Sequence, residues 1–240
     1  MERTELLNGI AVWLASRDFQ HPMRVGVDGI CGAGKTTFAS GLAAAIAATG
    51  RTVIHLDPDG FHNVREVRYR QGRDSARGYY EDAFAFESFE KLTLEPLGPS
   101  GNRRYVHHLH DLESDLVRPR WATAPQDAIV VFDETFIQRG SMREHWDEVI
   151  FLDVPRHSAI ERGAKRDAIL RGGEQAAREA FENRYMAACD LYLAEERPTD
   201  RASIVIDNSN PILPRLLRGP GALTQSTCSP VARKTSRPES

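Results

Sequence analysis

The hydrophobic positions of the chain form short continuous runs that alternate with segments of helical periodicity. Runs rich in Val, Ile and Leu are typical of strands buried on both faces of a parallel sheet. These runs are Met23–Val27, Thr52–Leu56, Ala128–Phe132, Val149–Asp153 and Ser203–Ile206. Helical patterns separate several of them, as at Lys35–Thr49 and Pro155–Arg166. The alternation predicts an α/β fold with a doubly wound, mostly parallel five-stranded sheet and helices on both faces.

Two stretches depart from this alternation. Residues 63–125 hold many charges, Gly and Pro, with one helix expected near Phe84–Leu94 and an extended piece near Arg104–His107. We interpret them as an excursion over the functional edge of the sheet. Residues 211–240 are dominated by Pro, Gly, Ser and basic residues without periodicity, which predicts a disordered tail. The predicted domain therefore spans residues 1–210.

Composition narrows the class of protein. Hydrophobic residues make up 41% of the 240 residues and charged residues 27%, which is ordinary for a soluble globular protein. The formal net charge of −3 gives no basic field for a nucleic acid, and no window approaches the roughly 20 apolar residues of a membrane span. The three cysteines are far apart and odd in number, so we expect no disulfide framework and a cytoplasmic location.

The most specific motif is "GICGAGKT", which runs from Gly29 to Thr36. It fits the P-loop pattern G-x-x-x-x-G-K-[ST], with an apolar strand before it and a helical pattern after it. In such a loop the backbone N–H groups surround phosphates, the lysine reaches the β- and γ-phosphates, and the hydroxyl of Thr36 ligates Mg²⁺. The predicted nucleotide-binding residues are Gly29, Ile30, Cys31, Gly32, Ala33, Gly34, Lys35, Thr36 and Thr37.

Other interpretations of this loop are weaker. A glycine-rich turn with a chance lysine would not need the flanking strand and helix. A dinucleotide-binding loop would need glycine at Thr37. Cys31 has no partner nearby in sequence, so we interpret it as a small filler rather than a nucleophile.

Acidic residues follow two of the predicted strands. Asp133 and Glu134 end the run "AIVVFDE", where a carboxylate holds Mg²⁺ directly or through water; Asp133 is preferred because it comes first after the run. Asp57 and Asp59 follow the run that ends at Leu56. Ligands of open α/β sheets bind outside the carboxyl ends of the strands, so either acid could accept a proton from an attacking hydroxyl. The alternative is that these acids are only turn residues.

A basic helix supplies candidate cations. Arg162, Lys165, Arg166 and Arg171 recur before Gly172-Gly173, and residues 162–175 are predicted to form a lid that closes over phosphates with the glycines as hinge. A solvated basic helix face is the alternative.

Together these motifs resemble the uridine kinase and phosphoribulokinase family of P-loop kinases over about residues 22–211. The matching pieces are "GVDGICGAGKTTFA", "HLDPDGFHN", "GYYEDAFAFESF", "FDETFIQRGSMREHWDEVIFLDVP", "RGAKRDAILRG" and "LYLAEERPTDRASIVIDNSNP". The resemblance implies an ATP- and Mg²⁺-dependent kinase that phosphorylates a hydroxyl of a small molecule.

The resemblance also assigns roles to residues. It implies that Asp59 is the general base near Mg²⁺, that Arg162, Arg166 and Arg171 contact the phosphates, and that Asn208 lies near the adenine ring. The implied acceptor-binding residues are Asp59, Phe61, His62, Tyr80, Asp82 and His110.

The acceptor stays open at this point. Where pyrimidine nucleoside kinases of the family have Tyr-Asp-Phe and then a base-reading histidine, this chain has His110-Asp111-Leu112 and then Asp115. A nucleoside such as uridine or cytidine is one candidate. A nucleotide or another anionic metabolite is the second, because the excursion contains a group of arginines: Arg65, Arg68, Arg70, Arg73 and Arg77. A non-catalytic ATP-binding regulator is the third, and a homo-oligomer is compatible with each of them.

Overall fold

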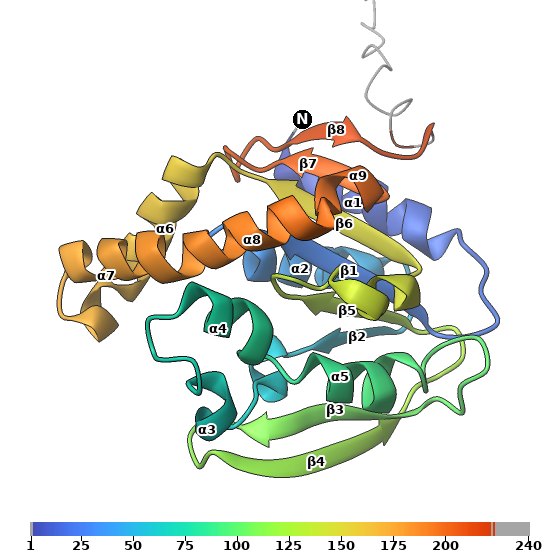
Figure 1. The fold of residues 1–240 in the computed structure, drawn as a ribbon. Helices are drawn as coiled ribbons and strands as arrows, with labels where there is room; N and C mark the ends of the chain where they lie inside the picture. The colour runs from blue at the N-terminus through green and yellow to red at the C-terminus, as the bar shows by residue number, and fades with distance from the viewer. Residues whose placement is uncertain (1, 222, 224–240) are drawn as a thin grey trace, which may run out of the picture.

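The computed structural model describes residues 2–221 and 223, and its centre is one twisted sheet (Figure 1). The strand order is β2-β5-β1-β6-β7-β8. All neighbours are parallel except β7 and β8. The strands are β1 (Met23–Gly29), β2 (Val53–Leu56), β5 (Ile129–Asp133), β6 (Glu148–Asp153), β7 (Ile204–Asp207) and β8 (Arg215–Arg218). The doubly wound, mostly parallel sheet predicted from the apolar runs is thereby confirmed.

Burial explains why these runs form the centre of the sheet. Every residue of β1 and of β5 is buried, and the two strands pair in register from Met23 with Ile129 to Val27 with Asp133. Strands covered on both faces need apolar side chains at successive positions, which is the pattern seen in the sequence.

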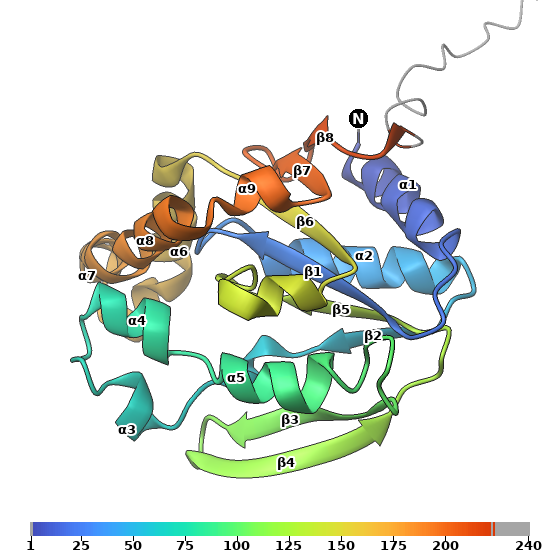
Figure 2. The ribbon, with the colours of Figure 1, turned by 45° about the vertical axis from the view of Figure 1, so that its right-hand side comes forward.

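Helices cover both faces of the sheet. Helix α2 (Lys35–Ala48) lies on one face and packs against α1 (Arg3–Ala15), while α8 (Ala187–Glu196) crosses the opposite face (Figures 1 and 2). Helix α6 (Arg156–Arg171) leaves β6 and is followed by α7 (Glu174–Ala180) and the π-helical segment η4 (Phe181–Met186), which continues into α8. A short helix, α9 (Pro198–Arg201), leads into β7.

The excursion is more ordered than its composition indicated. It contains the short helices α3 (Arg65–Arg68), α4 (Ala76–Asp82) and α5 (Phe86–Phe89), and the π-helical segment η2 (Glu90–Leu94). The expected extended piece is the start of β3 (Arg104–Asp111), which pairs antiparallel with β4 (Leu116–Thr123). Strand β4 was not predicted because most of its residues are exposed and it lacks an apolar run.

The predicted boundary at residue 210 is wrong. Strand β8 lies inside the expected tail and pairs antiparallel with β7, so the sheet has six strands rather than five. An ion pair between Arg215 and Asp207 joins the two strands, and N–H of Arg3 donates to the carbonyl of Ile212 at 3.2 Å. Residues 222 and 224–240 lie outside the described part of the chain, so the prediction of disorder there stays a prediction. Within the described part, no helix is both long enough and apolar enough to cross a bilayer.

Candidate active site

The P-loop connects β1 to α2 in the conformation that its glycines permit. Gly32 and Gly34 have φ values of 81° and 88°, which favour glycine. A Cβ atom on Gly32 would lie 2.3 Å from the carbonyl oxygen of Ala159, so the loop also needs glycine because α6 passes close to it. The N-terminus of α2 begins at Lys35, and its unpaired N–H groups suit a phosphate.

Lys35 is held across the mouth of this loop. Its Nζ atom donates to the carbonyls of Gly29 at 3.1 Å and Ile30 at 3.2 Å, and to Oγ1 of Thr135 at 2.6 Å. Thr135 follows the acids at the end of β5, so the lysine joins the P-loop to the neighbouring strand end.

One cavity of about 410 Å³ brings the predicted phosphate and metal residues together. Its walls come from the P-loop, the turn after β2, the end of β5 and helix α6. The lining residues include Lys35, Thr36, Thr37, Asp57, Asp59, His62, Asp133, Glu134 and Arg166. These residues are far apart in sequence, and the parallel order of β2, β5 and β1 brings the three strand ends to one edge.

The two acids after β5 have different surroundings. Asp133 is 2% exposed, and its Oδ1 lies 2.9 Å from Nε2 of His55 on β2. Desolvation raises the pKa of Glu134 to about 8, against the opposing effect of the Lys35 charge. Glu134 also accepts a hydrogen bond from N–H of Thr135 at 2.6 Å. The oxygen atoms of Thr36, Asp59 and Asp133 at this cavity are of the kind that Mg²⁺ prefers, so the residues present fit a magnesium ion.

The two acids after β2 also differ. Asp57 accepts a hydrogen bond from N–H of Asp59 at 3.0 Å and so caps the short 3-10 helix η1 (Pro58–Phe61). The Asp59 carboxylate is 69% exposed, and its Oδ1 lies 3.8 Å from Nδ1 of His62. Phe61 does not line the cavity: it is 1% exposed in the core, with its ring against Phe89 and Phe132.

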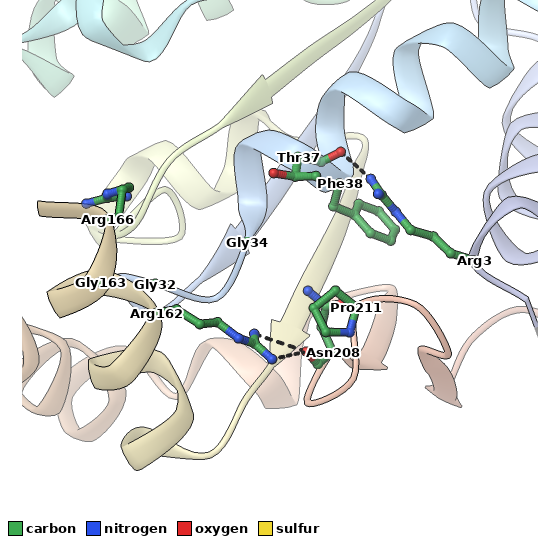
Figure 3. A pocket seen from close by; sticks show the side chains of 10 residues that line it. All are labelled: Arg3, Gly32, Gly34, Thr37, Phe38, Arg162, Gly163, Arg166, Asn208 and Pro211. Atoms are coloured by element: carbon green, nitrogen blue, oxygen red, sulfur yellow. Dashed lines mark hydrogen bonds between the residues drawn. The ribbon is translucent and has the colours of Figure 1, made fainter.

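A second cavity of about 270 Å³, whose lining residues are drawn in Figure 3, shares part of its wall with the first. Asn208 lies on its wall and donates from Nδ2 to the carbonyl of Ala33 at 2.8 Å. Arg162 donates to the carbonyls of Asn208 at 3.2 Å and Ser209 at 2.6 Å. Arg3 also lines it and donates to the carbonyl of Thr37. The two cavities share Gly32, Gly34, Thr37 and Arg166, so a ligand with its phosphates in the first could extend into the second.

The three predicted lid arginines do not line the same cavity. Arg162 lines the second cavity, and Arg166 lines both cavities while donating to Asp167 at 2.7 Å. Arg171 lines neither of these two and donates to the hydroxyl of Tyr185 at 2.6 Å. Gly172 and Gly173, with φ values of 78° and 138°, separate α6 from α7, where the sequence placed a hinge.

The predicted acceptor residues Tyr80, Asp82 and His110 are buried and line neither cavity. The Tyr80 ring packs edge-on against Phe136. Asp82 forms an ion pair with Arg70, and Nε2 of His110 lies 3.1 Å from Asp115. Their neighbours Tyr79 and Phe84 line the phosphate cavity instead, because the position within the short helix α4 and the turn after it decides which ring faces inward.

Several residues at the site were missed by sequence reasoning. Asp28 is fully buried and accepts from N–H of Gly29 at 2.7 Å, from Gln138 at 2.8 Å and from the hydroxyl of Tyr192 at 2.6 Å, so it fixes the start of the P-loop. Its place directly before "GICGAGKT" could have identified it. Arg3, by contrast, comes from a helix far from any motif, and no local pattern points to it.

Cys31 has a partner that its sequence neighbourhood does not reveal. Its N–H donates to Sγ of Cys189 on α8 at 3.4 Å, and its own Sγ lies 3.7 Å from the hydroxyls of Tyr79 and Thr135. The interaction with the Cys189 thiol, aided by the charge of Lys35, lowers the pKa of Cys31 to about 6 although burial opposes this.

Comparison with known proteins supports the assignment of the fold. No family model matches the chain. A dephospho-CoA kinase of Deinococcus radiodurans is 27% identical over 202 residues, which cover 80% of this chain and 86% of that protein. A "possible uridine kinase" from Bacillus stearothermophilus matches with a TM-score of 0.65 and 22% identity, over 83% of this chain and 96% of that one.

A second solved structure also has a similar fold. The structure of a "putative fructose transport system kinase" from Silicibacter sp. TM1040 matches with a TM-score of 0.64 and 22% identity, over 81% of this chain and 95% of that one. The chain thus shares the fold of these two solved structures, and the fold predicted from its motifs is confirmed.

Proposed function

We propose that the protein is a kinase that uses ATP and Mg²⁺ to phosphorylate a hydroxyl group of a small molecule. The observation that carries this proposal is the single cavity in which Lys35, Asp59, Asp133 and Arg166 meet. Phosphoryl transfer asks the protein chiefly to align the acceptor and to neutralise charge, and these side chains offer the groups for both tasks.

Each group has a role that follows from its place. The P-loop N–H groups and Lys35 bind the phosphates, and the adjoining cavity at Asn208 and Arg162 takes the rest of the nucleotide. Thr36 and Asp133 would hold Mg²⁺, which supplies charge neutralisation at the transferring group when bound. Arg166 adds a positive charge from α6.

Asp59 is proposed as the general base. Its exposed carboxylate faces the cavity beside the P-loop and is free to approach an acceptor hydroxyl, whereas Asp57 is engaged as a helix cap. Arg162, Arg166 and Arg171 all lie on α6, which belongs to the proposed lid with Gly172-Gly173 as its hinge.

A broad screen tests this function. The protein is incubated with ATP, Mg²⁺ and a metabolite extract, and mass spectrometry searches for a compound that gains one phosphoryl group. Lys35→Met is the control, because it removes the charge at the P-loop mouth and should abolish the gain. If ATP binds but no compound in the extract gains a phosphoryl group, a nucleotide-binding regulator becomes the better reading.

The acceptor is the finer question. The notion of a nucleoside such as uridine or cytidine comes from the family resemblance, and it is weakened because His110 is buried away from the cavity and pairs with Asp115. An anionic metabolite is favoured by the three arginines around Tyr69, which are Arg68, Arg73 and Arg184.

A further inference from the structure

Four buried side-chain nitrogen or oxygen atoms of the described residues lack a hydrogen-bond partner: Arg68 Nε, His108 Nε2, His110 Nδ1 and Arg184 Nε. All four belong to basic side chains. A buried donor without a partner is unfavourable by roughly 1–3 kcal/mol, so such atoms are uncommon and need an explanation. The two arginines are the more informative, because a guanidinium group stays charged and needs a counter-ion when it leaves water.

Both arginines belong to one cluster around Tyr69. The Cζ atoms of Arg68, Arg73 and Arg184 lie 5.5, 4.9 and 5.6 Å from the centroid of this ring. Arg184 comes from η4, whereas the other two come from the excursion, so the tertiary structure creates the cluster. The three cations attract the ring face but receive no neutralising charge from it.

The cluster adjoins the phosphate cavity through Tyr79. Arg184 Cζ lies 5.0 Å from the ring centroid of Tyr79, whose side chain lines the cavity. His62 also lines the cavity, where its Nδ1 lies 3.8 Å from Oδ1 of Asp59. The cluster therefore lies beside the part of the cavity wall that Tyr79 forms.

The carboxylates of the described residues do not balance this charge. Asp115 pairs with Arg68 at 3.4 Å, and the same carboxylate lies 3.1 Å from His110 Nε2 and accepts from N–H of Arg65 at 3.0 Å. Arg73 and Arg184 form no ion pair with any described residue. A surplus of positive charge beside a cavity favours an anionic ligand.

We infer that the acceptor carries an anionic oxygen group, a phosphate or a carboxylate, in addition to its hydroxyl, and that Arg68 and Arg184 bind this group beside Tyr69. The inference rests on the proposed function, since it concerns the substrate of the same site. A guanidinium fork matches both anions through paired N–H···O bonds. His62 and Tyr79 then separate the anionic group from the hydroxyl at Asp59.

The first experiment compares paired acceptors with and without an anionic group. The pairs are uridine and uridine 5′-monophosphate, ribose and ribose 5-phosphate, and glycerol and glycerate, each assayed for ADP release. We expect the charged member of a pair to have the higher kcat/KM. Arg68→Gln and Arg184→Gln should each raise the KM of that acceptor at least tenfold while leaving the KM for ATP unchanged. The control Arg118→Gln, on exposed β4, should change neither. Preference for the neutral members would overturn the inference.

The second experiment needs no known acceptor. The protein is saturated with MgADP, inorganic phosphate is titrated, and the rise in melting temperature is measured. Wild type and Arg118→Gln should be stabilised, and the double variant Arg68→Gln/Arg184→Gln should lose this response. Arg184→Lys, which keeps the charge without the fork, replaces the glutamine variant if circular dichroism shows unfolding, and should lose most of the response. Equal responses in all proteins would overturn the inference.

The two failures are distinguishable. If the arginine variants lose the phosphate response but no acceptor is ever phosphorylated, the proposed function fails and the anion site stands. If neutral acceptors are phosphorylated and the arginine variants behave like wild type, the kinase function stands and the anion site fails.

Discussion

Asp57 accepts a hydrogen bond from the backbone N–H of Asp59 at 3.0 Å, so the first acid shapes the turn that presents the second. The two carboxylates after β2 are therefore not equivalent. Both residues are exposed and line the cavity, but Asp57 also caps η1, whereas the Asp59 carboxylate is 69% exposed. This division gives a direct comparison of two otherwise matched variants.

Asp59→Asn should lower kcat by roughly 10²–10⁴-fold, because the acceptor hydroxyl loses its base, with little change in ATP affinity. Asp57→Asn should reduce activity less, because an asparagine still caps η1. Steady-state ADP release measures kcat, and circular dichroism verifies folding of both variants. A larger loss of turnover in Asp57→Asn, with both proteins folded, would show that the base is assigned to the wrong acid.

Arg162→Ala should raise the KM for ATP by about tenfold. The guanidinium connects α6 to the carbonyls of Asn208 and Ser209, and hydrogen bonds from charged groups contribute about 1.5–3 kcal/mol. ADP release at varied ATP concentration measures the effect. The matched control is Arg178→Ala on α7, whose ion pair with Glu174 is 4.0 Å long, and its KM should match wild type. Similar KM values for both variants would argue against a nucleotide in the second cavity.

Gly163→Ala should destabilise the protein by roughly 1–3 kcal/mol. A Cβ atom at Gly163 would lie 1.9 Å from the Phe181 ring, which is 1% exposed and joins α6 to η4. Urea unfolding measures the change. Gly9→Ala is the control with the opposite expectation. Gly9 lies within helix α1, and its added Cβ atom would be 3.8 Å from Leu223, an ordinary van der Waals distance. Alanine is favoured over glycine inside a helix, so the free energy of unfolding should rise by about 0.5–1 kcal/mol. A neutral Gly163→Ala would mean that α6 and η4 are packed more loosely than the structure shows.

Cys31 should react with iodoacetamide as a low-pKa thiol. Only the thiolate attacks, so a pKa of about 6 means that labelling rises with pH through that value rather than near the usual 8–9. MgATP should slow the reaction, because Cys31 lines the phosphate cavity. Mass spectrometry of the labelled peptides measures it. Cys189, with 1% exposure and a pKa raised by the adjacent Cys31 thiol and by burial, serves as the internal control and should stay unlabelled. Labelling of Cys189 ahead of Cys31 would reverse the assignment of the thiolate.

The sequence by itself determined the parts of this protein that depend on contiguous residues. Lys35, Gly32 and Gly34 belong to one loop whose shape follows from glycine conformations and from the strand and helix on either side. The buried strands were equally visible, because a parallel sheet covered on both faces requires an apolar residue at nearly every position.

Only the tertiary structure decided what depends on the meeting of distant segments. Strand β8 was missed because its stability comes from pairing with β7 rather than from an apolar run of its own. Tyr79 rather than Tyr80 faces the cavity because the packing of α4 sets the rotation of the helix. Arg184 joins Arg68 only after η4 packs against α4, so no spacing in the chain could reveal their shared, unbalanced charge.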